Sequence, residues 1–89
     1  MHALNDEPEV KIANAVQQLL KQRAIDKSFN FQENLLSIGL TSLDMTSLIL
    51  SVEADFAIQI PDRVITPANF ASVTTIGRLV RELTARAGH

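Results

Sequence analysis

Apolar residues recur at helical spacing in three separate segments of this chain, and this periodicity constrains its fold more than any other feature. The pattern predicts amphipathic helices over about 6–22, 42–56 and 72–86. Each helix has one apolar stripe, so the three must pack against one another and give an all-α fold. The stripes are Val10, Ala13, Val16, Leu19 and Leu20, with Ile12 on the flank; Met45, Leu48, Ile49, Val52 and Phe56; and Val73, Ile76, Leu79, Val80 and Leu83.

Capping residues mark the ends of two of these helices. Asp6 and Glu9 have the spacing of a capping box, and Pro8 is tolerated in a first helical turn. Ser72 can cap the last helix, and Gly88 follows its end. These residues set the expected boundaries of the first and last helices.

The connections between the helices differ in length. Residues 24–41 lose the helical periodicity, so we expect a long loop pinned by apolar anchors, and such loops are usually functional. Gly39 lies just before the second helix, where unusual dihedral angles or a close approach would favour glycine. Residues 57–61 are expected to be an extended link, since Pro61 keeps the residue before it out of helical geometry. Residues 62–70 are expected to hold a short helical turn or two.

Length and composition limit the class of protein. A chain of 89 residues forms one domain, expected over 1–89 with its core at about 7–86 and frayed ends. It has no cysteine, and its two histidines, His2 and His89, lie in those ends, so we expect no disulfide and no metal site. A net charge of −2 argues against nucleic-acid binding. No signal peptide opens the chain and no apolar stretch approaches membrane-spanning length, so we expect a cytoplasmic protein.

Two motifs flank the second helix. The first reads Gly39-Leu40-Thr41-Ser42-Leu43-Asp44, and the second reads Phe56-Ala57-Ile58-Gln59-Ile60-Pro61-Asp62. With the helix order, these motifs resemble the acyl carrier protein family, which includes peptidyl carriers, over about 10–83. The resemblance implies a four-helix bundle of acyl-carrier type, with a long loop between helices one and two and a short third helix. It also implies that 4′-phosphopantetheine from coenzyme A is attached to Ser42.

The chemistry of Ser42 agrees with this placement. A hydroxyl at a helix N-terminus can hold a phosphodiester against free backbone N–H groups and the positive end of the helix dipole. Seen without its flanking motifs, Ser42 would be better explained as an ordinary N-cap. A serine hydrolase would need a positioned base and an oxyanion pocket, which two terminal histidines do not supply, so we expect no enzyme.

The resemblance also implies partners. A phosphopantetheinyl transferase loads the arm, an acyl- or aminoacyl-loading ligase charges its thiol, and a downstream synthase or tailoring enzyme uses the thioester. The carrier itself is expected to be a monomer. By position, the docking candidates are Leu43, Thr46, Ser47, Leu50 and Arg63. Leu43 and Leu50 could instead be residues at the edge of the core.

The kind of carrier depends on the surface of the second helix. Thr41 stands where fatty-acid carriers usually have Asp, and Ser47 and Ala54 occupy positions that are often acidic in that group. The segment 65–73 is similar to stand-alone carriers of specialised pathways, and Phe70 within it is expected to fill the core. We therefore expect a stand-alone acyl or aminoacyl carrier of polyketide or nonribosomal peptide type. The alternatives are a fatty-acid-type carrier and a small helical interaction module without cofactor.

Overall fold

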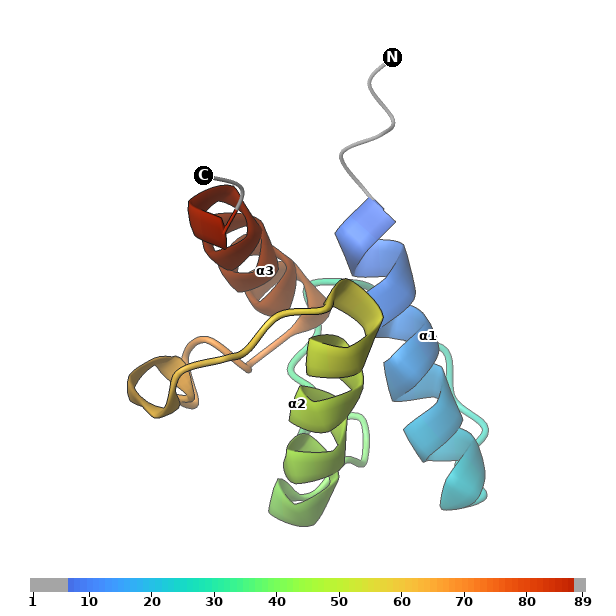
Figure 1. The fold of residues 1–89 in the computed structure, drawn as a ribbon. Coiled ribbons are helices and arrows are strands. Elements are labelled where there is room, and N and C mark those ends of the chain that lie inside the picture. The colour runs from blue at the N-terminus through green and yellow to red at the C-terminus, as the bar shows by residue number, and fades with distance from the viewer. Residues whose placement is uncertain (1–6, 88–89) are drawn as a thin grey trace.

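A computed structural model describes residues 7–87 of the chain, with side chains through residue 85. The described part folds into three α-helices without a strand (Figure 1), so the expected all-α fold is confirmed. The helices are α1 (Glu7–Gln22), α2 (Ser42–Phe56) and α3 (Val73–Ala87). All three lie where the apolar spacing predicts them.

The fourth helix of the expected bundle is not confirmed. Where a short third helix is expected, Asp62–Val64 form a single 3-10 turn, η2, and residues 67–70 form a second turn. Pro67 and the β-branched residues before it work against a longer helix, because they remove a backbone donor and crowd the helical turn. The link before η2 reaches Pro61 through Ile60, which is buried.

The core lies where α1 packs against both α2 and α3. α1 and α2 run antiparallel side by side, so the end of α1 and the start of α2 lie at the same end of the molecule (Figure 1). Ile12 is fully buried whereas Val10 is 48% exposed, so the prediction that placed Val10 in the stripe is wrong. The buried residues of α1 are Glu9, Ile12, Val16, Leu19 and Leu20, which follow one another at intervals of three, four, seven and eight residues on one face of the helix. The largest fully buried side chains are Ile12, Leu20, Leu35, Leu48, Ile76, Val16, Val52, Val73 and Val80.

The loop between α1 and α2 is pinned by apolar anchors, as predicted. The buried anchors are Leu35, Ile38 and Leu40. The Leu35 N–H also donates to the Ala71 carbonyl (2.8 Å), which ties the loop to the start of α3. Gly39 has a φ of +121°, and a Cβ there would lie 2.8 Å from Ile25 Cδ1. The chain therefore needs glycine at this position to enter α2.

Glu9 joins α1 to α3. Its side chain is buried, and its carboxylate accepts two hydrogen bonds from the Arg81 guanidinium, Nη2 to Oε1 at 2.8 Å and Nη1 to Oε2. The carboxylate lies against Gly77 of α3, where the missing side chain leaves room for it. The Arg81 hydrogen bonds hold the pKa of Glu9 below its ordinary value, although burial raises it.

Of the predicted caps, Ser72 is confirmed. Its hydroxyl accepts the Thr75 N–H (3.2 Å), and the Thr75 hydroxyl accepts the Ser72 N–H (3.0 Å). The paired bonds satisfy backbone donors at the start of α3. Asp6, Gly88 and the two histidines lie outside the described residues.

Candidate functional site

Ser42 is the first residue of α2, and it is exposed. The N-cap is the preceding residue, Thr41, whose hydroxyl accepts the Asp44 N–H (3.3 Å). The Asp44 carboxylate in turn accepts the Thr41 N–H (2.8 Å), so the two residues form a capping box. The hydroxyl of Ser42 takes no part in this cap. The interpretation of Ser42 as an ordinary N-cap is therefore wrong.

Arg23 completes a polar network at the start of α2. It lies just beyond α1, and its Nε donates to Asp44 Oδ2 (2.6 Å) while its Nη2 donates to Thr41 Oγ1 (3.3 Å). The Arg23 hydrogen bond, helped by the Thr41 donors, holds the pKa of Asp44 below its ordinary value although burial raises it. At neutral pH Asp44 is thus ionised, and the guanidinium of Arg23 balances its charge.

A cavity of about 300 Å³ opens beside Ser42. It is lined by the first two turns of α2, the loop before α2 and the segment after η2. The lining residues are Asn34, Leu36, Ser42, Met45, Ile49, Ile65, Thr66, Pro67, Phe70 and Ala71. Phe70 is buried, which confirms it as a core residue. These residues fit phosphopantetheine, since its phosphate needs an accessible hydroxyl near a helix N-terminus and its uncharged arm tolerates an apolar neighbour.

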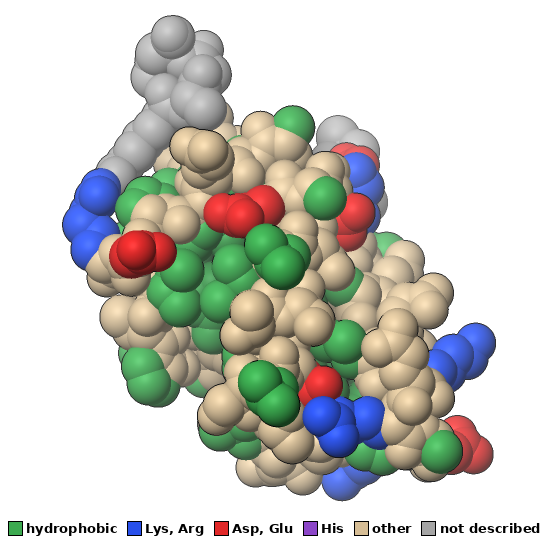
Figure 2. All heavy atoms as spheres, turned by 60° about the horizontal axis from the view of Figure 1, so that its bottom comes forward, with side chains coloured by type: hydrophobic (Ala, Val, Ile, Leu, Met, Phe, Trp, Pro, Cys, Tyr) green, Lys and Arg blue, Asp and Glu red, His purple; other side chains and the backbone are tan. Residues whose placement is uncertain are grey.

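The five docking candidates are all exposed. Leu43 and Leu50 are 78% and 61% exposed, which contradicts their interpretation as residues at the edge of the core. Thr46 and Ser47 are exposed on α2, and Arg63 is exposed on η2. In Figure 2, where the bottom of Figure 1 is turned forward, acidic and basic side chains are scattered and do not form one strongly charged patch.

Most residues of the site, Leu36 and Arg23 among them, were not identified from the sequence. Leu36 is an apolar residue of the loop between α1 and α2, yet it is 57% exposed and lines the cavity with Ser42. The sequence feature that could have indicated the exposure of Leu36 is Asn34, two residues earlier, because asparagine favours a local turn. In this turn the Asn34 side chain accepts the Leu36 N–H (2.9 Å). Arg23 carries no such signal, because its partners lie 18 and 21 residues further along the chain.

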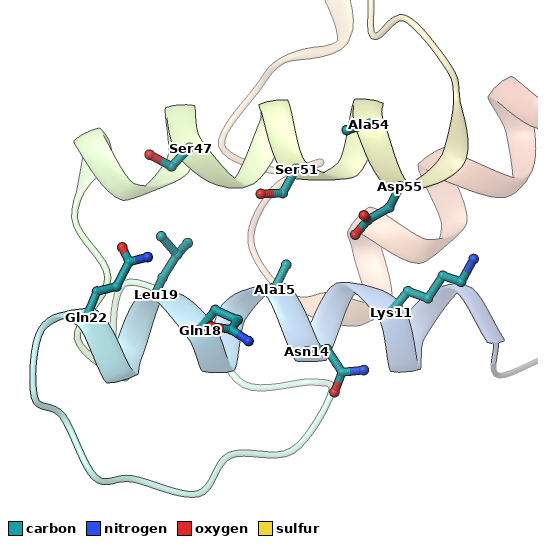
Figure 3. Close-up of a pocket in the computed structure, with 10 residues that line it drawn as sticks. All are labelled: Lys11, Asn14, Ala15, Gln18, Leu19, Gln22, Ser47, Ser51, Ala54 and Asp55. Carbon is teal, nitrogen blue, oxygen red and sulfur yellow. The ribbon is translucent and has the colours of Figure 1, made fainter.

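A second, larger hollow of about 570 Å³ lies between α1 and α2 (Figure 3). The side chains of Ser47, Ser51 and Asp55 project from α2 toward α1 in this view. Asn14 and Gln18 of α1 also line it beside Ala15 and Leu19, so polar and apolar surface are mixed in this hollow. Ser42 is not among its lining residues. The smaller, apolar cavity is therefore the candidate site, and Ser47 lies at a different surface.

Comparison with known proteins decides the family. The family model for the phosphopantetheine attachment site matches residues 10–83. The chain belongs to this family. It is a carrier protein with a phosphopantetheine attachment site, and it acts as a substrate of partner enzymes without catalysing a reaction itself. The family resemblance inferred from the two motifs is thereby confirmed.

Relatives of this carrier have similar lengths. Aminoacyl carrier protein 1 of Bradyrhizobium diazoefficiens is 42% identical over 80 residues, which cover 90% of this chain and 89% of that protein. Aminoacyl carrier protein 2 of the same organism is 35% identical over 80 residues, which cover 90% of each chain.

Solved structures match the carrier over most of its length. One matched chain comes from Bradyrhizobium japonicum glycine:[carrier protein] ligase complexed with glycylated carrier protein, with a TM-score of 0.68 and 42% identity, covering 79% of this chain and 97% of that one. Another comes from the ligase with its cognate carrier protein and an analogue of glycyl adenylate, with a TM-score of 0.70 and 41% identity, covering 82% of this chain and 97% of that one.

Among the described residues of this carrier, no helix is long and apolar enough to cross a membrane.

Proposed function

We propose that the protein is a stand-alone aminoacyl carrier, which holds an amino acid as a thioester on a phosphopantetheine arm attached to Ser42. The observation that carries the proposal is the position of Ser42, exposed at the start of α2 with the capping role taken by Thr41. The amino-acid cargo is supported by relatives that are 42% and 35% identical and are named aminoacyl carrier proteins.

Ser42 supplies the oxygen in the loading reaction. Its Oγ forms a bond to the phosphorus of coenzyme A that bears the pantetheine, and the bond to the neighbouring phosphate breaks. Adenosine bisphosphate leaves, and the hydroxyl proton passes to a base on the transferase. The positive end of α2 favours the phosphodiester that results. The bound group then supplies a thiol that forms the thioester.

The proposed partners follow from this cycle. A phosphopantetheinyl transferase attaches the arm, an aminoacyl-loading ligase charges it, and a downstream synthase or tailoring enzyme in the cytoplasm removes the cargo. Relatives occur in complexes with a glycine:[carrier protein] ligase, which favours a small amino acid as cargo. The carrier acts as a monomeric single domain over 1–89.

The proposed docking surface has little charge. Its residues are Leu43, Thr46, Ser47, Leu50 and Arg63. Leu43 and Leu50 are seven residues apart, so they lie on one face of α2. Asp44, the acidic residue in the first turn, is paired with Arg23. This arrangement supports a partner with an apolar, neutral surface over a fatty-acid-type partner that docks through a basic patch.

Intact mass after incubation with coenzyme A and a broad-specificity phosphopantetheinyl transferase tests the proposal. The parent and Ser51→Ala should each gain one phosphopantetheine, whereas Ser42→Ala should gain none. Ser51→Ala is a matched control, because Ser51 is also exposed on α2 and lies outside the proposed docking surface. Absence of a gain in the folded parent, with a transferase that modifies another carrier, would overturn the attachment at Ser42.

A second mass measurement tests the cargo. The arm-bearing protein is incubated with ATP and, in separate samples, with a glycine:[carrier protein] ligase and glycine or alanine, or with a fatty-acid:carrier ligase and a short fatty acid. We expect a mass increase with an amino acid and none with the fatty acid. Loading only by a fatty-acid ligase would contradict the amino-acid proposal while leaving the carrier role intact.

A further inference from the structure

Arg23 links two elements that the attachment serine depends on. It follows α1 directly, yet it hydrogen-bonds to the residue before Ser42 and to the residue two positions after it. Asp44 Oδ2 accepts from Arg23 Nε (2.6 Å), from the Thr41 N–H (2.8 Å) and from the Thr41 hydroxyl (3.1 Å). Three donors from two elements thus converge on one buried carboxylate oxygen.

Building on the proposed attachment at Ser42, we propose that Arg23 is a positioning residue, which acts through Asp44 and Thr41 to hold the first turn of α2 and with it the serine hydroxyl. Thr41 and Asp44 form a local capping box that fixes the turn only relative to itself. Arg23 adds the bond that fixes this turn relative to the end of α1. Ser42 is thereby presented to the transferase from a defined position on the protein.

Arg23 contributes less to stability than Arg81 does. Its side chain is 40% exposed and donates one hydrogen bond to the Asp44 carboxylate, whereas Arg81 donates two to Glu9, so the protein should stay folded without Arg23. Transfer to a hydroxyl is sensitive to its placement, because reacting atoms must meet at a defined distance and angle. Loss of Arg23 should therefore lower the loading rate of a protein that remains folded.

The test compares Arg23→Gln with Lys21→Gln. Both variants remove one positive charge near the end of α1, but among the described residues Lys21 makes no hydrogen bond to the start of α2. For Arg23→Gln, we expect kcat of phosphopantetheine transfer to fall about three- to tenfold with KM for the carrier nearly unchanged, since the docking residues are intact. Lys21→Gln should match the parent in kcat.

The amide resonance of Thr41 provides a readout that does not depend on the transferase. Its N–H donates to Asp44, so its chemical shift should follow the titration of that carboxylate. Arg23 is the charged group that acts on Asp44 and lowers its pKa. The midpoint should therefore move to higher pH in Arg23→Gln and stay in place in Lys21→Gln.

The outcomes separate this inference from the proposed function. A parent that gains no arm contradicts the proposed function. If the parent is loaded and Arg23→Gln has the same kcat as Lys21→Gln, only the positioning role is overturned. A Thr41 titration midpoint that does not move in Arg23→Gln also overturns it. The variant Arg23→Lys is a control for a folding defect, because it keeps the positive charge. One ammonium group cannot bridge Asp44 and Thr41 as a guanidinium does, so the kcat of Arg23→Lys should lie between those of Arg23→Gln and Lys21→Gln.

Discussion

The substitution Gly77→Ala should destabilise the protein through Glu9. A Cβ at residue 77 would lie 2.7 Å from the Glu9 Cδ, and the three nearest atoms all belong to that side chain. The end of the Glu9 side chain can move away, but only by leaving Arg81. Loss of these charge-assisted bonds costs about 2 kcal/mol, a value reduced because Arg81 is 42% exposed. Alanine in a helix interior returns about 1 kcal/mol, so the net loss is about 1 kcal/mol.

The sign of the effect should reverse when Glu9 is truncated. In a Glu9→Ala background the atoms that meet the new Cβ are gone, so Gly77→Ala should stabilise the protein by about 1 kcal/mol. Urea unfolding of the four proteins of this double-mutant cycle measures the difference, expected to be about 2 kcal/mol. The same change in unfolding free energy for Gly77→Ala in both backgrounds would refute the reasoning.

Two further predictions concern the acid response and the end of α2. In the folded state the pKa values of Glu9 and Asp44 lie below their ordinary values of 4.5 and 3.8. Their contribution to stability is therefore complete above the ordinary values, and the unfolding free energy should fall as the pH drops from there through the lower, folded-state pKa values. Urea unfolding at several pH values should show a weaker fall for Glu9→Gln than for the exposed control Glu82→Gln. Ala57 has a φ of 55°, so Ala57→Gly should stabilise the protein by roughly 0.5–1 kcal/mol, measured beside Ala54→Gly, which should destabilise it.

The positions of the helices could be predicted because their signals are local. Apolar spacing predicts α2 and α3, and the Ser72 hydroxyl marks where α3 begins. The burial of Ile12 instead of Val10 follows the same local signal. Ile12 lies four, seven and eight residues before Val16, Leu19 and Leu20, whereas Val10 lies six residues before Val16 and therefore on another face of α1.

Only the part of the candidate site that has a local signal could be predicted from the sequence. The flanking motifs identify Ser42, and Thr41 with Asp44 three residues later has the spacing of a capping box, a local signal that the sequence contains. The contact of Arg23 with Asp44 spans 21 residues, and that of Glu9 with Arg81 spans 72. Pairs this far apart meet only after the helices pack, so no local pattern predicts them.

The cap at Thr41, one residue before Ser42, has a chemical consequence for a carrier. An N-cap oxygen must accept a backbone N–H, and a phosphoester oxygen on a bulky arm is a weaker acceptor than a free hydroxyl. If Ser42 were the cap, attachment of the arm would weaken the start of the helix that presents it. Because Thr41 and Asp44 satisfy these backbone groups, Ser42 can be modified without loss of a helical hydrogen bond. The start of α2 can therefore be the same before and after loading, as a surface that several enzymes recognise in turn requires.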